Sequence, residues 1–183
     1  MLEKLFSFVG GDEGSWKVER IEAVSGPSLS SVSRIEVLNG DFDRSSRDHS
    51  WVIRGVTSNA RYTTRAEKNV LAAKQATLGR NEASCAALIP IRKSAEWWEL
   101  AQDERRKILE EQSEHIKIGA MYLPAIARRL HHSRDLGEEF DFLTWFEYAP
   151  SDTPAFDELV GRLRSSVEWN YVDWEVDIRL SLA

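Results

Sequence analysis

The chain has 183 residues, and 24 Lys and Arg against 30 Asp and Glu give it a formal net charge of −6. Its 42% hydrophobic and 30% charged content is typical of one compact domain. An acidic chain lacks the basic field that nucleic-acid binding requires, and a single cysteine excludes an internal disulfide or a cysteine-based metal cluster. Because no apolar run could span a bilayer and no signal peptide is visible, we expect a cytoplasmic protein without nucleic-acid or membrane partners.

The first eighty residues are expected to be rich in strands. Short apolar stretches predict strands at Leu5–Val9, Trp16–Val24 and Trp51–Thr57, and the GGDEG sequence between the first two predicts a turn. The segment 25–50 is rich in Ser, Asp, Asn and Gly, which predicts a loop. Arg65–Leu78 has the composition of a helix, although the pattern also allows a strand.

From Cys85 onward, the pattern predicts the order β-α-β-β-α-β. The strands are Cys85–Ile91, Ile126–Arg134, Phe140–Ala149 and Tyr171–Leu180, and the helices are Ser94–Leu100, Asp103–Ile116 and Thr153–Ser165. Pro90 places the first of these strands near a sheet edge, and Leu136-Gly137-Glu138 predicts a hairpin. We therefore predict an α+β, ferredoxin-like fold of the dimeric α/β-barrel type. Residues 85–183 would form a complete unit and residues 1–80 a trimmed copy, joined in one unit over 1–183.

His115 and Glu168 are candidates for a paired site. Helical spacing puts His115 on the face of Ile108 and Gln112, where a hydrogen-bonded core histidine is more common than a metal ligand. A ligand role needs a partner that fixes the tautomer of the imidazole. Glu168 shares the alternation of the buried face of the last strand, so it either pairs there or faces water from irregular chain. The spacing favours neither outcome.

Arg128 is a candidate anion-binding residue. Alternation puts it on one face of its strand with Leu130 and His132, and puts Arg129 and His131 on the other face. If the strand is central, one of the two arginines points inward, and an inward guanidinium implies an anion. The alternative is an ordinary surface ion pair.

A second polar group could form the rim of a pocket. Lys93 and Trp97 lie one helical turn apart, near Tyr62, and could together bind carboxylates. The simpler interpretation is a lysine stem that covers an exposed indole. No GxGxxG, GxxxxGK[ST], HExxH or GxSxG sequence occurs, so dinucleotide-binding, P-loop, zincin and hydrolase functions have no supporting motif.

Three long segments of the chain resemble the chlorite dismutase family. They are LIPIRKSAEWWELAQDERRKILEEQSEHI, YLPAIARRLHHSRDLGEEFDFLTWFEYAP and VEWNYVDWEVDIRLSL. The resemblance extends from about Trp51 to Leu182, is weaker over residues 25–50, and in chain length is to the short, homodimeric branch. It implies a non-covalently bound haem b and the conversion of the small anion chlorite to chloride and dioxygen, with the O–O bond formed at a ferryl haem.

The resemblance also assigns roles to residues that match its motifs. His115, in SEHI, would be the proximal iron ligand, and Glu168, in VEWNYV, would accept the hydrogen bond from its Nδ1–H. Arg128, in PAIARRL, would be the distal arginine. The remaining distal residues would be Gln75, Thr144 and Phe146, and the residues at the propionates or the haem edge would be Tyr62, Lys93 and Trp97.

Two other functions are considered. The first is a coprohaem decarboxylase-like enzyme of haem biosynthesis, against which the arginine in PAIARRL argues because that relative lacks it. The second is a haem-binding or haem-sensing module without turnover. Oxygen evolution from chlorite would separate the dismutase from both.

Overall fold

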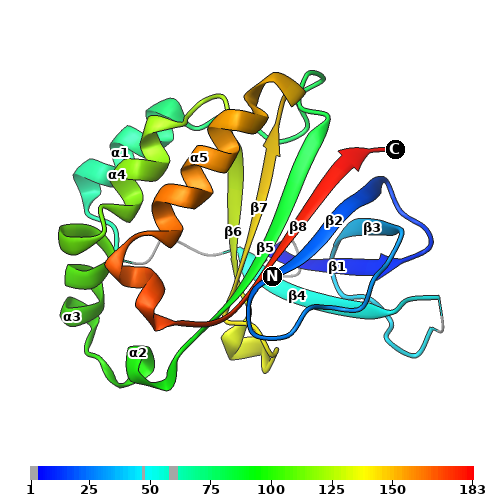
Figure 1. Cartoon of the computed structure of the whole chain (residues 1–183), viewed down its shortest axis with the longest axis horizontal. Coiled ribbons are helices and arrows are strands. Elements are labelled where there is room, and N and C mark those ends of the chain that lie inside the picture. The colour runs from blue at the N-terminus through cyan, green and yellow to red at the C-terminus, as the bar shows by residue number, and fades with distance from the viewer. Residues whose placement is uncertain (1–3, 47, 58–61) are drawn as a thin grey trace.

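The computed structural model describes residues 4–46, 48–57 and 62–183, and its centre is a closed antiparallel β-barrel (Figure 1). The order around the barrel is β1-β3-β2-β8-β5-β7-β6-β4, and β4 pairs with β1 to close it. The strands of this described part are β1 (Leu5–Gly11), β2 (Trp16–Ser25), β3 (Arg34–Asn39), β4 (Trp51–Thr57), β5 (Cys85–Lys93), β6 (Ala127–His132), β7 (Phe142–Tyr148) and β8 (Val172–Leu182).

The helices gather on one side of the barrel, beside β5, β6 and β7 (Figure 1). In the described residues they are α1 (Arg65–Lys74), α2 (Ala95–Glu99), α3 (Gln102–Arg106), α4 (His115–Met121) and α5 (Thr153–Arg164). A π-helical turn, Lys107–Gln112, joins α3 to the segment that precedes α4. The helices therefore form a layer on one side of the barrel.

The predicted ferredoxin-like α+β fold is wrong. Strands from both halves of the chain enter one closed barrel, because β8 pairs with β2 and β6 pairs with β4. The predicted loop 25–50 contains β3, which pairs with both β1 and β2 and so is needed for closure. Its six residues, RIEVLN, are flanked by polar sequence that hides the strand. Element order alone does not say whether the edges of a sheet stay open or meet, and here they meet.

Strand β5 is not near an edge, contrary to the prediction from Pro90. It pairs with β7 along Cys85–Ile91 and with β8 on its other side. The pairing with β8 runs from Cys85 to Leu88 and resumes at Ile91, so it skips Pro90. A central strand accommodates proline here because the ladder is interrupted where the missing N–H would lie.

Alternation along the strands creates two apolar surfaces. Inside the barrel, Phe8, Ile35 and Trp145 belong to one buried cluster. On the outer face, Ile89 and Phe146 pack against α5 in a second cluster. The buried residues of α5 share one face of the helix, and they are Phe156, Leu159, Val160 and Leu163. The outer face is thus a second core layer beneath the helices.

Helix α1 is attached to this layer mainly by polar contacts. No side chain of α1 is buried, but Glu67 forms a two-pronged ion pair with Arg106, with Oε1 2.7 Å from Nη2 and Oε2 2.9 Å from Nη1. The hydrogen bonds from Arg106 lower the pKa of Glu67 to about 2. Thr64 and Glu67 also form a capping box that fixes the start of the helix. The ion pair thus joins α1 to α3, and the capping box fixes where α1 begins.

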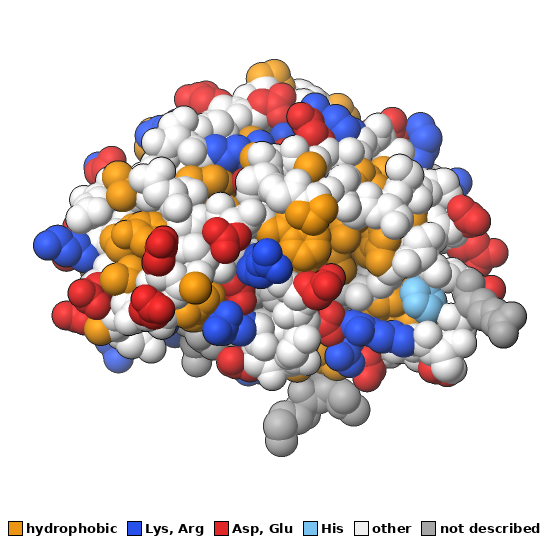
Figure 2. Space-filling model, turned by 60° about the horizontal axis from the view of Figure 1, so that its bottom comes forward, with side chains coloured by type: hydrophobic (Ala, Val, Ile, Leu, Met, Phe, Trp, Pro, Cys, Tyr) orange, Lys and Arg blue, Asp and Glu red, His pale blue; other side chains and the backbone are white. Residues whose placement is uncertain are grey.

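The face of the molecule in Figure 2 carries side chains of both charges rather than of one sign. Figure 2 shows acidic and basic side chains interspersed with hydrophobic ones across the face turned forward. In the described ranges, none of the helices combines the length and the apolar character that crossing a membrane requires. A buried cation would make the electrostatic potential around it positive even though the chain as a whole is negatively charged.

Candidate functional site

A cavity of about 650 Å³ lies between the outer face of β5–β7 and the helices α1, α4 and α5. Apolar side chains such as Leu71, Ile89 and Phe146 line much of it, which is typical of sites for cofactors and small molecules. The structure brings all the predicted site residues to this one cavity. They are Tyr62, Gln75, Lys93, Trp97, His115, Arg128, Thr144, Phe146 and Glu168.

His115 reaches the cavity because the helix predicted over Asp103–Ile116 is not continuous. The π-helical turn ends at Gln112, and Glu114 then adopts a left-handed conformation with φ of 51°. A left-handed non-glycine residue is costly, and such strain is found at functional sites. His115 starts α4 directly after it, and the backbone N–H of Ile116 donates to Oε2 of Glu110 at 2.8 Å. The break turns the imidazole towards the cavity.

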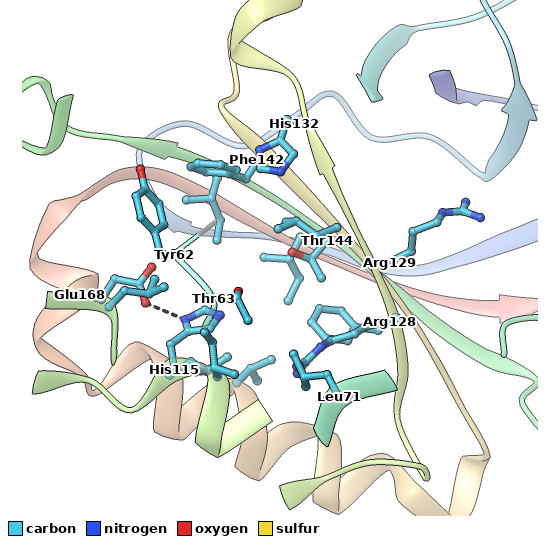
Figure 3. Close-up of a pocket in the computed structure, with 18 of the residues that line it drawn as sticks. Tyr62, Thr63, Leu71, His115, Arg128, Arg129, His132, Phe142, Thr144 and Glu168 are labelled. Atoms are coloured by element: carbon cyan, nitrogen blue, oxygen red, sulfur yellow. Dashed lines mark hydrogen bonds and ion pairs between the residues drawn. The ribbon is translucent and has the colours of Figure 1, made fainter. Parts of the chain in front are cut away.

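The imidazole of His115 is oriented by a buried carboxylate. Nδ1 of His115 lies 2.6 Å from Oε2 of Glu168, whose side chain is 4% exposed (Figure 3). A carboxylate accepts a hydrogen bond, so Nδ1 carries the proton and the lone pair is left on Nε2. Nδ1 is thus occupied, and Nε2 is the nitrogen left to bind a ligand in the cavity.

Glu168 is buried for a different reason from the one predicted. It lies in a 3₁₀ turn, Val167–Tyr171, before β8 begins, so strand alternation does not apply to it. Its backbone N–H donates to Oγ of Ser113 at 2.9 Å, which attaches this turn to the residue just before the start of α4. Burial opposes the ionisation of Glu168, but the neighbouring His115 and Lys93 outweigh it and lower the pKa to about 2. The site therefore contains a carboxylate that is ionised at neutral pH.

Lys93 is not on the rim but in the interior. Its Nζ lies 2.7 Å from Oε1 of Glu168, and both side chains are 4% exposed. The ammonium also lies 4.5 Å from the ring centroid of Trp97 and 5.5 Å from that of Trp169, which are cation–π distances. Lys93 thus neutralises the charge of Glu168 on the side away from His115.

Two other predicted residues that line the cavity, Trp97 and Tyr62, carry hydrogen-bond donors. Trp97 is 1% exposed, and in the described residues its indole N–H finds no acceptor. Buried N–H groups are seldom left unpaired, so this one is unusual among the polar groups of the residues that line the cavity. The Tyr62 hydroxyl accepts a hydrogen bond from Nη1 of Arg105 at 3.3 Å, which leaves its own O–H to donate.

Arg128 projects into the cavity from β6. None of the residues that the structure describes forms an ion pair or hydrogen bond with its guanidinium, and burial lowers the pKa of this group. An arginine remains charged at neutral pH despite such a shift, because its ordinary pKa is so high. Its neighbour Arg129 extends away from His115 (Figure 3) and donates from Nε to Nε2 of His131 at 2.9 Å. The prediction that the two arginines take opposite faces is confirmed.

The remaining predicted residues surround Arg128. Thr144 and Phe146 lie on the face of β7 that lines the cavity, and Phe146 pairs in register with Arg128. Gln75 is exposed just after the end of α1, and its Nε2 donates to the carbonyl oxygen of Arg128 at 3.4 Å. These contacts fix the strand on which Arg128 lies.

Sequence analysis missed a buried ionic group among the residues that line the cavity. Glu175 of β8 is 1% exposed and accepts hydrogen bonds from Nη2 of Arg164 at 2.7 Å and from the indole of Trp169 at 2.7 Å. The ring of Trp169 lies nearly parallel to that of His115. The sequence contained one signal for this ionic group. Acidic residues alternate along β8, and the last turn of α5 carries arginines that can pair with them.

Comparison with known proteins identifies relatives of this chain. The family model described as chlorite dismutase matches residues 29–181. A chlorite dismutase from Ideonella dechloratans is 36% identical over 90 residues, which is 49% of this chain and 30% of that protein. The chain thus matches less than a third of the length of this curated relative.

Solved structures extend the similarity over nearly the whole chain. The structure of dimeric chlorite dismutases from Nitrobacter winogradskyi is 54% identical, with a TM-score of 0.91, over 97% of this chain and 99% of that one. A W145V mutant of the chlorite dismutase from Candidatus Nitrospira defluvii is 17% identical, with a TM-score of 0.69, over 98% of this chain and 91% of that one. At that identity, the second comparison shows a shared fold alone.

Proposed function

The chain belongs to the chlorite dismutase family, and we propose that it is a haem-dependent oxidoreductase that converts chlorite to chloride and dioxygen. The observation that carries this proposal is the arrangement of His115, paired through Nδ1 with Glu168, in one cavity with the guanidinium of Arg128, to which none of the described residues is hydrogen-bonded. The cofactor would be haem b, held non-covalently as the family resemblance implies and not through a CxxCH motif, which the sequence lacks, and the enzyme would act in the cytoplasm.

The donor set fits a haem better than a bare metal ion. The described part of the chain contains no cluster of three or more His, Cys, Asp or Glu side chains that could hold a metal. A metal bound by His115 alone must bring its other ligands with it, as the iron of a porphyrin does. The cavity is largely apolar, as a porphyrin requires, and Trp97 and Tyr62, which line it, would donate to the propionates. Lys93 is less suited to that role, since Glu168 already binds it.

The chain's own residues would bind the haem iron, orient the imidazole that binds it, and enclose the chlorite anion. Nε2 of His115 would bind the iron, and Glu168 would keep the proton on Nδ1 and increase the basicity of the ring. When bound, the haem supplies the redox chemistry that rearranges chlorite, ClO₂⁻, into Cl⁻ and O₂ without an external electron donor. Arg128 would hold the anion by charge-assisted hydrogen bonds, and Thr144 and Phe146 would limit its movement and exclude water.

The test of this function is oxygen evolution. Protein loaded with one equivalent of hemin, mixed with chlorite in a Clark cell, should release one O₂ and one chloride per chlorite consumed. A coprohaem decarboxylase-like enzyme or a haem-binding module would bind its porphyrin and release no oxygen above the level of free hemin. That result would overturn the proposed reaction while leaving haem binding intact.

We also propose that the protein is a homodimer. The support is the resemblance to the short branch of the family and the dimeric relative from Nitrobacter winogradskyi, which matches 97% of this chain. Light scattering at micromolar concentration should give twice the chain mass of 20.9 kDa. A mass of one chain would contradict the prediction, and a mass of five chains would place the protein nearer the long branch.

Glu168→Gln should raise the reduction potential of the bound iron and weaken haem retention by about 10–100-fold. The amide keeps the shape of the side chain but removes the charge that stabilises ferric over ferrous iron through His115. Spectroelectrochemistry measures the potential, and transfer of hemin to apomyoglobin measures retention. Glu138→Gln is the control, because the side chain of Glu138 is also little exposed and ion-paired, but with Arg44 and Arg54, and it does not line the cavity. An unchanged potential in Glu168→Gln would argue against the contact.

A further inference from the structure

Two hydrogen bonds join the turn that carries Glu168 to the segment that carries His115. In one, Nδ1 of His115 lies 2.6 Å from Oε2 of Glu168. In the other, the backbone N–H of Glu168 donates to Oγ of Ser113 at 2.9 Å. Ser113 is 4% exposed and lies shortly before His115 in the chain. The backbone and the side chain of Glu168 are therefore both bound by one short stretch, residues 113–115.

Ser113 caps a turn that is distant in the sequence. Glu168 lies in the first turn of the 3₁₀ helix Val167–Tyr171, where a backbone N–H has no acceptor within the helix. The residue before this helix, Ser166, is of a type that usually supplies the acceptor. It forms no side-chain cap hydrogen bond, and its Oγ donates instead to the carbonyl oxygen of Leu163 at 2.6 Å. The acceptor for the N–H of Glu168 comes from Ser113, 55 positions earlier in the chain.

The backbone between Ser113 and His115 is held in one conformation. The N–H of Ser113 donates to the carbonyl oxygen of Glu110 at the end of the π-helical turn. Glu114 follows in the left-handed conformation, which persists only where the surrounding structure fixes it, and His115 then begins α4. The acceptor at Ser113 and the donor at His115 are thus presented to Glu168 with a fixed spacing.

A lysine binds the same carboxylate from the side away from His115. Nζ of Lys93 lies 2.7 Å from Oε1 of Glu168. An ammonium group attracts a carboxylate over a broad range of directions, whereas the hydrogen bond from Nδ1 weakens steeply when its angle is lost. If the turn were free to shift, the carboxylate would stay with Lys93 and lose its alignment with the imidazole. The hydrogen bond to Ser113 opposes that shift.

We propose that Ser113 is a positioning residue for the imidazole of His115: its hydroxyl oxygen caps the turn that carries Glu168 and so holds the carboxylate in line with Nδ1. The inference rests on the proposed function, since it concerns the histidine that would bind the haem iron. Ser113 does not line the cavity, so it acts on that histidine through Glu168 and not by contact with the haem or the anion.

The apoprotein allows a test that needs no haem. Ser113→Ala removes the acceptor, and Ser113→Thr keeps it. Ser7→Ala is the matched control, because Ser7 is fully buried and its Oγ also bonds to a backbone group, the carbonyl oxygen of Gly40 at 2.8 Å, but it lies in β1, outside the site. ¹⁵N NMR measures which ring nitrogen of neutral His115 carries the proton, and His115→Ala assigns the signal. The ratio of the Nδ1–H to the Nε2–H form should fall about 3–10-fold in Ser113→Ala alone, as expected when one hydrogen bond is weakened.

Hemin-loaded protein gives a second set of readouts. The Nδ1 hydrogen bond sets how much electron density the imidazole gives to the iron. Ser113→Ala should therefore raise the reduction potential, in the direction expected for Glu168→Gln but by less. Resonance Raman spectroscopy should show a lower iron–histidine stretching frequency, and hemin retention should fall by at most about 10-fold. Ser113→Thr and Ser7→Ala should keep the parental values of all three quantities.

The outcomes separate a positioning role from a structural one. If Ser113→Ala loses stability but keeps the parental tautomer ratio, stretching frequency and potential, the serine serves only the fold and the inference is overturned. Equal shifts in Ser113→Thr or in Ser7→Ala would overturn it as well, because the acceptor oxygen at 113 would then not be their cause. If Ser113→Ala does not fold, Ser113→Cys takes its place, since it keeps the shape of the side chain with a weaker acceptor, and parental values in that variant count against the inference. If the parent binds no hemin, the proposed function fails, while the tautomer ratios of the apoproteins still decide the role of Ser113.

Discussion

His115→Ala should lose stable hemin binding, with a dissociation constant raised by about 100-fold or more. Substitution of a group that only orients a metal ligand costs about 10–100-fold in affinity, so loss of the ligand itself should exceed that range. No replacement is near, since in the described chain the cavity is lined by only one other histidine, His132, and Cys85 does not line it. Optical titration of the apoprotein with hemin measures the change.

Imidazole should restore the spectrum of His115→Ala. The substitution leaves a space next to the carboxylate of Glu168, which can accept a hydrogen bond from a free imidazole as it does from His115. His49→Ala is the control for loss of a histidine outside the cavity. His132→Ala is the discriminating variant, because His132 lines the same cavity. If hemin affinity falls in His132→Ala and not in His115→Ala, the iron ligand has been assigned to the wrong residue.

Several helices and strands were predictable because burial of one face makes apolar residues recur at a regular spacing along the sequence. Trp51–Thr57 was predicted with the bounds of β4, and the helix predicted from Thr153 differs from α5 by one residue at its end. The hairpin between β6 and β7 was also predicted, with Gly137 at a positive φ in its turn. Each of these segments has one face against a core, so hydrophobicity records its geometry.

Closure of the barrel was not predictable from the same information. It depends on β3, whose one fully buried residue is Ile35, and on the pairing of β4 with β6 over only two residue pairs. Such short pairings leave little trace in a hydrophobic pattern, yet they decide between an open sheet and a barrel. The prediction of an edge at Pro90 failed for the same reason, because a closed barrel has no edges.

The cavity residues were predictable as a group, but their contacts were not. Family resemblance placed His115, Glu168 and Arg128 in one site, and the structure puts them on one cavity. The pairing of Lys93 with Glu168 crosses 75 positions of sequence and has no local signature. Burial of Glu168 was suggested by an alternation that does not exist there, since the residue lies in a 3₁₀ turn. Long-range charge pairing follows from the tertiary fold and cannot be read from spacing.

Arg128→Ala should keep hemin affinity near the parental value and lower chlorite turnover by about 10²–10³-fold. The guanidinium is not an iron ligand, so its loss leaves His115 and Glu168 in place. The decrease is comparable to removal of one preorganised donor from a site where charge must be stabilised. Arg129→Ala is the matched control: Arg129 is adjacent on the same strand and also borders the cavity, but it extends away from His115 and donates to Nε2 of His131 (Figure 3). Its turnover should stay within a few-fold of the parent.

The oxidant that escapes from Arg128→Ala would show what the arginine does. Removal of one oxygen atom from chlorite leaves hypochlorite, an anion that the guanidinium would hold in the cavity until both oxygen atoms leave as O₂. Without that cation, hypochlorite should reach solution, O₂ yield per chlorite should fall, and haem should bleach after fewer turnovers.

Met121, which is 60% exposed, should be among the side chains oxidised, as mass spectrometry of the spent enzyme would detect. Free methionine, a hypochlorite scavenger, should then protect Arg128→Ala more than the parent or Arg129→Ala. Equal O₂ yield and equal lifetime in all three proteins, with no effect of methionine, would mean that Arg128 does not retain the intermediate anion.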